Sequence, residues 1–182
     1  MDIQYQLTFL SQWRSDAGAS FGASTDNSVV RDADGLPFFP GKTLKGLLRE
    51  AAEDYNELSG GQYSKDITTI FGDQGIEGKC HFSDAKFEEK EVKQIVSGHL
   101  QKYLFHSTTT TALDDKGLKI DHSLRTLEAV VPCTLFGTIY NVPDGAKELM
   151  TQSFKFIKYI GMHRNRGLGR CQLEEKGGNE NE

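Results

Sequence analysis

The residues best suited to binding an anion lie near the C-terminus, where glycines alternate with arginines. Residues 161–170 read Gly-Met-His-Arg-Asn-Arg-Gly-Leu-Gly-Arg. Basic side chains in and before this run are Lys155, Lys158, Arg164, Arg166 and Arg170. Guanidinium groups match phosphate geometry, and glycines let the backbone approach a ligand closely. No carboxylate occurs from Leu149 to Leu173, although the net charge of the chain is -5. This local basic charge indicates a surface that faces nucleic acid, with a solvated basic loop as the alternative.

A second group of cations surrounds the expected start of a helix. The segment is Pro40-Gly41-Lys42-Thr43-Leu44-Lys45-Gly46-Leu47-Leu48-Arg49. Cations oppose the helix dipole at this end, whereas the free backbone N–H groups and the lysines together favour a bound phosphate. A solvated helix start with tolerated lysines explains the pattern equally well. The spacing of a nucleotide-binding P-loop is absent.

Carboxylates and thiols give weaker signals. Residues 22–32 form a Gly/Ser/Asn-rich stretch that contains Asp26 and Asp32, and aspartates in such surroundings are most often turn or cap residues. Three cysteines, far apart in the sequence, favour neither a disulfide framework nor a zinc site. We expect a cytoplasmic protein, because the chain has no basic, apolar leader and no apolar run long enough to cross a membrane.

The hydrophobic pattern predicts the elements that position these residues. Residues 3–9 alternate as in a half-buried strand, and residues 14–42 have no period, as in a long loop. Apolar residues at helical spacing follow, with Thr43 as the expected cap and 59–61 as the end. The remaining elements are expected as short strands (68–71 and 79–87), a short helix (88–102), a polar hairpin (103–125, tip at 114–117), a β-rich run (126–140), a second helix from Asp144 to Gly161 with Leu149, Ser153, Phe156, Ile157 and Ile160 inward, and a last strand (168–173).

This order predicts an α+β fold with a βαββαβ ferredoxin-like (RRM-like) core. We expect a single domain over residues 1–182, with a long N-terminal loop, an inserted hairpin at 103–125 and an acidic, frayed tail at 174–182. The sheet face of such a fold can carry single-stranded RNA.

Several motifs, taken in order, resemble one family. They are Asp26-Asn27-Ser28-Val29-Val30-Arg31-Asp32, Phe39-Pro40-Gly41-Lys42-Thr43-Leu44-Lys45-Gly46, Ile70-Phe71-Gly72, Phe82-Ser83-Asp84-Ala85 and the glycine-rich loop 161–169. Together they resemble the RAMP superfamily of CRISPR proteins, and specifically the backbone (Cas-seven-like) subunits of type III effector complexes. The chain is short for such a subunit, and Lys42 stands where the family often has a small residue.

The resemblance implies an antiviral RNA-binding protein that polymerises along a guide RNA. Its partners would be guide RNA, target RNA, further copies of itself or related backbone subunits and other type III subunits, without a membrane. The hairpin would be the thumb that displaces one nucleotide per repeat. Asp26 matches the catalytic position, where it would hold Mg²⁺ or Mn²⁺ for endoribonuclease cleavage of target RNA. The residues that we assign to RNA binding are Lys42, Thr43, Lys45, Arg49, His163, Arg164, Arg166 and Arg170.

Two other functions fit the same sequence. In a purely structural backbone subunit, Asp26 would only cap its loop. A guide-processing endoribonuclease of the superfamily would use histidine chemistry, for which the candidates are His106, His122 and His163. The N-terminal loop has no recognisable catalytic histidine, which argues against that second function.

Overall fold

The computed structural model describes residues 1–15, 29–110, 118, 125–162 and 164–177. Its core consists of β1 (Ile3–Phe9), α1 (Gly41–Leu58), β4 (His81–Phe82), β7 (Thr134–Tyr140), α4 (Lys147–Phe156) and β8 (Cys171–Glu175). These four strands form an antiparallel sheet in the order β4-β7-β1-β8. The third core strand therefore lies between the first and the second, and the fourth pairs with the first. This βαββαβ arrangement confirms the predicted ferredoxin-like core.

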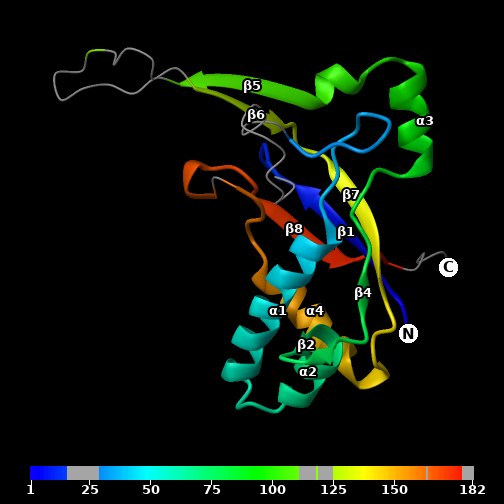
Figure 1. Cartoon of the computed structure of the whole chain (residues 1–182), viewed down its shortest axis with the longest axis vertical. Coiled ribbons are helices and arrows are strands. Elements are labelled where there is room, and N and C mark those ends of the chain that lie inside the picture. The colour runs from blue at the N-terminus through cyan, green and yellow to red at the C-terminus, as the bar shows by residue number, and fades with distance from the viewer. Residues whose placement is uncertain (16–28, 111–117, 119–124, 163, 178–182) are drawn as a thin grey trace.

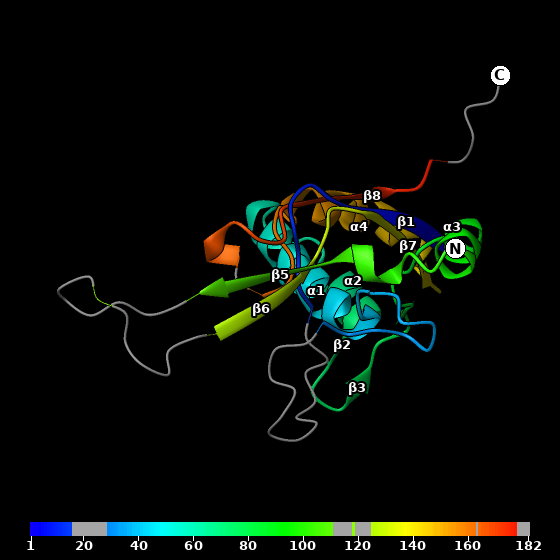
Figure 2. The same ribbon diagram turned by 90° about the horizontal axis from the view of Figure 1, so that it is seen from above.

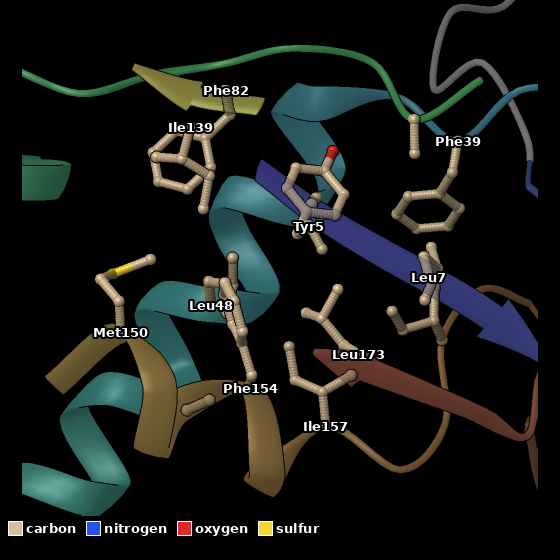
Figure 3. Close-up of a cluster of buried hydrophobic side chains, with 14 of the residues drawn as sticks. Tyr5, Leu7, Phe39, Leu48, Phe82, Ile139, Met150, Phe154, Ile157 and Leu173 are labelled. Atoms are coloured by element: carbon tan, nitrogen blue, oxygen red, sulfur yellow. The ribbon is translucent and has the colours of Figure 1, made fainter. Parts of the chain in front are cut away.

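The alternation in β1 determines which face of the sheet is covered. Ile3, Tyr5, Leu7 and Phe9 are each at most 2% exposed and point toward α1 and α4. Both helices pack on this face, where Leu48, Met150 and Phe154 meet the strand side chains (Figure 3). Within the described residues, no helix has both the length and the apolar character required to cross a membrane.

The start of α1 differs from its prediction. The helix begins at Gly41, two residues before the predicted cap Thr43, and its N-cap residue is Pro40. Gly41 donates its backbone N–H to Asp84 Oδ1 at 2.9 Å. A Cβ atom on Gly41 would lie 2.2 Å from the carbonyl oxygen of Phe82, so only glycine fits here. Asp84 thus caps the helix, and the carboxylate takes the place that we expected a phosphate to occupy.

The strand predicted at 68–71 is wrong. This segment belongs to α2 (Ser64–Phe71), followed by a short hairpin of β2 (Gly72–Asp73) and β3 (Ile76–Glu77). Its β-branched residues suggested a strand, but Ile67, Ile70 and Phe71 are buried together on one side of a helix. Tertiary packing has overridden local propensity. The strand predicted at 79–87 is limited to β4, with isolated bridges at Ala85 and Lys86.

The long insertion between β4 and β7 begins with α3 (Glu89–Ser97) and a 3₁₀ turn, η1 (Gln101–Leu104). β5 (Phe105–Thr110) and β6 (Arg125–Val130) then pair antiparallel, from Phe105 opposite Val130 to Thr110 opposite Arg125. The two strands project from the body of the molecule (Figure 1, Figure 2). Pairing extends to Val130, beyond the predicted hairpin end at 125, whereas the predicted tip at 114–117 lies outside the described residues.

Two C-terminal boundaries also change. A 3₁₀ turn, η2 (Asp144–Ala146), precedes α4, which ends at Phe156 and not at Gly161. Phe156, predicted to face inward, is 40% exposed. The acidic tail predicted from 174 is shorter, because its first two residues complete β8, while residues 178–182 lie outside the described residues.

The Asp84 cap can be tested directly. We expect Asp84→Ala to lower the free energy of unfolding by about 1 kcal/mol, the usual cost of a lost N-cap. Asp54→Ala, on the exposed side of α1, should change it by less than about 0.5 kcal/mol. Urea unfolding followed by circular dichroism measures both variants. Equal effects of the two substitutions would show that Asp84 is not the cap.

Candidate nucleic-acid interface

Residues 10–15, which follow β1, hold the inserted hairpin and the Gly/Arg loop at one end of the molecule. Trp13 exchanges backbone hydrogen bonds with Val130 at the end of β6, with N···O distances of 3.0 and 2.7 Å. On the other side, Met162 donates to the carbonyl of Arg14 at 3.0 Å, and Gly169 donates to that of Gln12 at 2.7 Å. Two segments that are far apart in sequence therefore share one support (Figure 1).

An aromatic cluster connects the same end to the start of α1. The rings of Phe9 and Trp13 stack with centroids 4.2 Å apart, and Phe39 lies 6.3 Å from each of them. All three side chains are buried. Since Phe39 directly precedes Pro40 and α1, the cluster fixes the helix start against the support of the hairpin and the Gly/Arg loop.

The glycines of the Gly/Arg loop shape the loop itself. Gly161 and Gly169 have φ values of +91° and +74°, a region that favours glycine. A Cβ on Gly161 would lie 2.2 Å from Arg14 O, and one on Gly169 would lie 1.9 Å from Ile160 O. These two glycines therefore allow close packing against the protein's own backbone. Of the loop's glycines, Gly167 (φ +82°) has open space around its Cβ position, as an approaching ligand requires.

The predicted RNA-binding side chains occupy different environments. Lys42 and Thr43 are exposed on the first turn of α1, and Lys45 is half-buried. Arg166 and Arg170 are exposed; Arg166 belongs to the 3₁₀ turn η3 (Arg164–Arg166). For Arg164 only this backbone placement is described, and His163 lies outside the described residues. All of these assignments remain predictions.

Arg49 is already engaged with carboxylates. Its Nε donates to Glu53 Oε1 at 2.8 Å, and Asp73 Oδ1 lies 4.0 Å from its Nη2. The hydrogen bond to Glu53 is the main cause that raises the pKa of Arg49. A phosphate would have to compete with these side chains, so Arg49 is the weakest of the predicted contacts.

A groove of about 580 Å³ runs between the end of α4 and β8. Lys155, Lys158 and Arg170 bring positive charge to it, and Leu10 and Tyr159 add apolar surface. The same groove contains Glu174 and Glu175, so its charge is mixed. The basic stretch seen in the sequence thus divides between this groove and the exposed loop that contains η3.

The predicted catalytic residue Asp26 lies outside the described residues. Among the residues that are described, no group of three or more His, Cys, Asp and Glu side chains could hold a metal ion. A divalent ion would therefore depend on Asp26 and on ligands from outside the described chain. Asp32 has the structural role expected of it, since its Oδ1 accepts hydrogen bonds from the N–H groups of Asp34 and Leu36 at 3.0 and 2.9 Å.

The candidate histidines show little sign of acid–base chemistry. His106 lies on β5, with its Nδ1 3.4 Å from Thr108 Oγ1. This neighbour is a hydroxyl of the same strand, whereas a general base is usually oriented by a carboxylate. His122 and His163 lie outside the described residues.

A charged cluster at the base of the hairpin has no counterpart in the sequence-based assignments. Arg31 Nη2 lies 2.6 Å from Glu128 Oε1, and the Arg31 guanidinium carbon is 3.8 Å from the centre of the Phe105 ring. Arg31 belongs to the Val-x-Arg-Asp motif, which was a signal for importance. Nothing in the sequence pairs it with a glutamate 97 positions later.

Sequence comparison identifies the family. The model of the RAMP superfamily matches residues 6–172, which is most of the chain. The protein therefore belongs to the RAMP superfamily, as its motifs predicted.

Particular relatives come from type III CRISPR systems. The CRISPR system Cms endoribonuclease Csm3 of Methanocaldococcus jannaschii is 29% identical over 178 residues, covering 83% of this chain and 68% of that protein. A chain of the type III-B Cmr-beta complex bound to cognate target RNA superposes with a TM-score of 0.70 at 10% identity, covering 96% of both chains. A chain of the apo complex gives 0.69 at 11% identity, covering 96% of this chain and 97% of that one. At such identities the two structures establish similarity of fold.

The two environments of glycine in the Gly/Arg loop provide a matched test. Gly169→Ala must displace backbone as well as strain φ, whereas Gly167→Ala only strains φ. We expect Gly169→Ala to lower the free energy of unfolding by about 1–3 kcal/mol more than Gly167→Ala does, the usual cost of overpacking. Thermal and urea unfolding measure the difference. Equal destabilisation would mean that the loop does not pack on Ile160 as described.

Proposed function

We propose that this protein is an RNA-binding backbone subunit of a type III CRISPR effector complex. The observation that carries the proposal is the common support of the Gly/Arg loop and the hairpin by residues 10–15. A subunit that tracks a guide RNA needs a cationic surface for the backbone and a projecting element that reaches the duplex. The relationship to the Methanocaldococcus jannaschii protein supports the same assignment.

The RNA contacts of this subunit are directed mainly at phosphates. Arg166 and Arg170 are exposed, and Lys42 and Thr43 occupy the exposed first turn of α1. Such contacts fix the register of the nucleic acid without reading its sequence, which suits a protein that must accept any guide. Further copies of the chain, or related subunits, would continue the interaction along the RNA.

We further propose that the subunit cleaves target RNA through Asp26. The 2′-hydroxyl of the RNA is the nucleophile, and it must align with the neighbouring phosphorus and the departing 5′-oxygen. The hairpin would splay the RNA, and the Asp26 carboxylate would orient the 2′-hydroxyl and help to remove its proton. When bound by Asp26 and RNA oxygens, Mg²⁺ or Mn²⁺ would supply positive charge to stabilise the transition state.

A non-catalytic backbone subunit is the second candidate. The observation that favours it is the lack of a metal-binding group among the described residues. A guide-processing enzyme is less well supported, because His106 contacts a threonine of its own strand. Cleavage of target RNA by the reconstituted complex distinguishes these functions.

The first test concerns the basic loop. Arg164→Ala/Arg166→Ala should weaken RNA binding uniformly across sequences, and should reduce the slope of log K against log salt by roughly 0.7 for each phosphate that is no longer neutralised. The control Lys90→Ala/Lys93→Ala removes two exposed charges from α3. Filter binding at several salt concentrations measures both. Equally weakened binding in the two variants would indicate a general charge effect and not an RNA site.

The second test concerns Asp26. We expect Asp26→Ala to abolish metal-dependent cleavage while guide and target binding persist, because a polar loop substitution usually costs under about 1 kcal/mol of stability. Asp34→Ala, another loop carboxylate, should still cleave. Labelled complementary RNA is incubated with each reconstituted complex in Mg²⁺, Mn²⁺ or chelator. Unchanged fragments from Asp26→Ala would place catalysis elsewhere, and an inactive wild-type complex would favour the structural subunit.

A further inference from the structure

Glu128 joins three separate groups at the base of the hairpin. One carboxylate oxygen, Oε1, accepts from Arg31 Nη2 at 2.6 Å, and the other, Oε2, accepts from the backbone N–H of Val29 at 3.2 Å. The Arg31 guanidinium also covers the Phe105 ring at 3.8 Å. Phe105 begins β5 and Glu128 lies in β6, so Arg31 contacts both strands of the hairpin.

The strand register explains why both side chains are available to Arg31. Phe105 lies opposite Val130, and Ser107 lies opposite Glu128. Because side chains alternate along a strand, Phe105 and Glu128 project from the same face of the hairpin as diagonal neighbours. A cation above that face can therefore stack on the ring and pair with the carboxylate together.

Both ends of the segment 16–28 are held at this place. At its C-terminal end, Val29 is bound by Glu128 and is only 4% exposed. At its N-terminal end, Ser15 O accepts from Val30 N–H at 3.2 Å, and Trp13 pairs with Val130. The loop that contains Asp26 is consequently attached at both ends to the last residues of β6.

Chain length makes this attachment relevant to Asp26. Three residues of fully extended chain span at most about 11 Å, so the Asp26 backbone must lie within that distance of Val29. The Glu128 side chain is 22% exposed and that of Arg31 is 41% exposed. A charge-assisted contact that is partly shielded from water holds its geometry better than a fully exposed ion pair.

We infer that Glu128 is a positioning residue that couples the hairpin to the loop of Asp26. This inference rests on the proposed cleavage by Asp26. When RNA engages the hairpin, Glu128 and Arg31 transmit the hairpin's placement to Val29, and Asp26 reaches the RNA in a fixed relation to the splayed nucleotide. Glu128 acts through Val29 and Arg31 and does not itself touch the reacting atoms.

The main test is Glu128→Gln, which keeps the shape of the side chain but removes its charge. In the reconstituted complex at saturating target RNA, the single-turnover cleavage rate should fall by about tenfold or more, as misplacement of a reacting group predicts. Target affinity should not change, because Glu128 contributes no phosphate contact. Glu175→Gln is the control, since it breaks the comparable Lys147–Glu175 pair (3.1 Å) on the sheet and should retain the wild-type rate.

Arg31 variants separate positioning from simple loss of stability. Arg31→Lys keeps a cation for both Glu128 and the Phe105 ring, and should retain most of the cleavage rate. Arg31→Gln removes the cation and should match Glu128→Gln. A wild-type rate for Glu128→Gln, or equal rates for Arg31→Lys and Arg31→Gln, would overturn the inference.

Amide hydrogen exchange supplies a measurement that needs no cleavage. Glu128→Ala removes the acceptor of the Val29 N–H, so residues 29–31 should exchange faster in this variant than in Glu175→Ala. Unchanged exchange at 29–31 would show that Glu128 does not hold this segment, whatever the cleavage rate. Accelerated exchange together with full cleavage by Asp26→Ala would retain the clamp and reject the proposed role of Asp26, so the two failures are distinguishable.

Discussion

The pairing of Trp13 with Val130 is the constraint on which the functional end of the molecule depends. It joins the segment after the first core strand to the last residue of the inserted hairpin, and Trp13 is fully buried against Phe9 and Phe39. A two-stranded hairpin is at best marginally stable in isolation. The exposed Thr-rich β5 offers little apolar surface of its own, so this hairpin depends on the core of the domain at its base.

Position along the hairpin therefore determines the role of each residue. Ala129 and Val130 are buried at the base, Leu127 and Glu128 are half-buried, and Thr126 is exposed. Apolar contacts fix the base, and the ion pair of Glu128 with Arg31 lies where burial gives way to water. The strand can thus be anchored at one end and still present polar surface to a partner along the rest of its length.

Elements whose information is local could be predicted from the sequence. Strict alternation predicted β1, and helical spacing predicted the body of α1. The strand expected at 68–71 failed because its β-branched residues pack on a helix, where Thr69 Oγ1 donates to Lys65 O at 2.8 Å. Long-range partners carried no local signal: the cap of α1 comes from Asp84, and the partner of Arg31 comes from Glu128.

The glycines show how one residue type serves two purposes that sequence cannot separate. Gly161 and Gly169 permit the Gly/Arg loop to close on Arg14 and Ile160, whereas Gly167 has free space around it. Closure of the loop restricts η3, and a restricted loop loses less conformational entropy when it binds a ligand. The packing glycines therefore contribute to recognition indirectly: they hold the exposed Arg166 on a backbone whose shape is set before any RNA arrives.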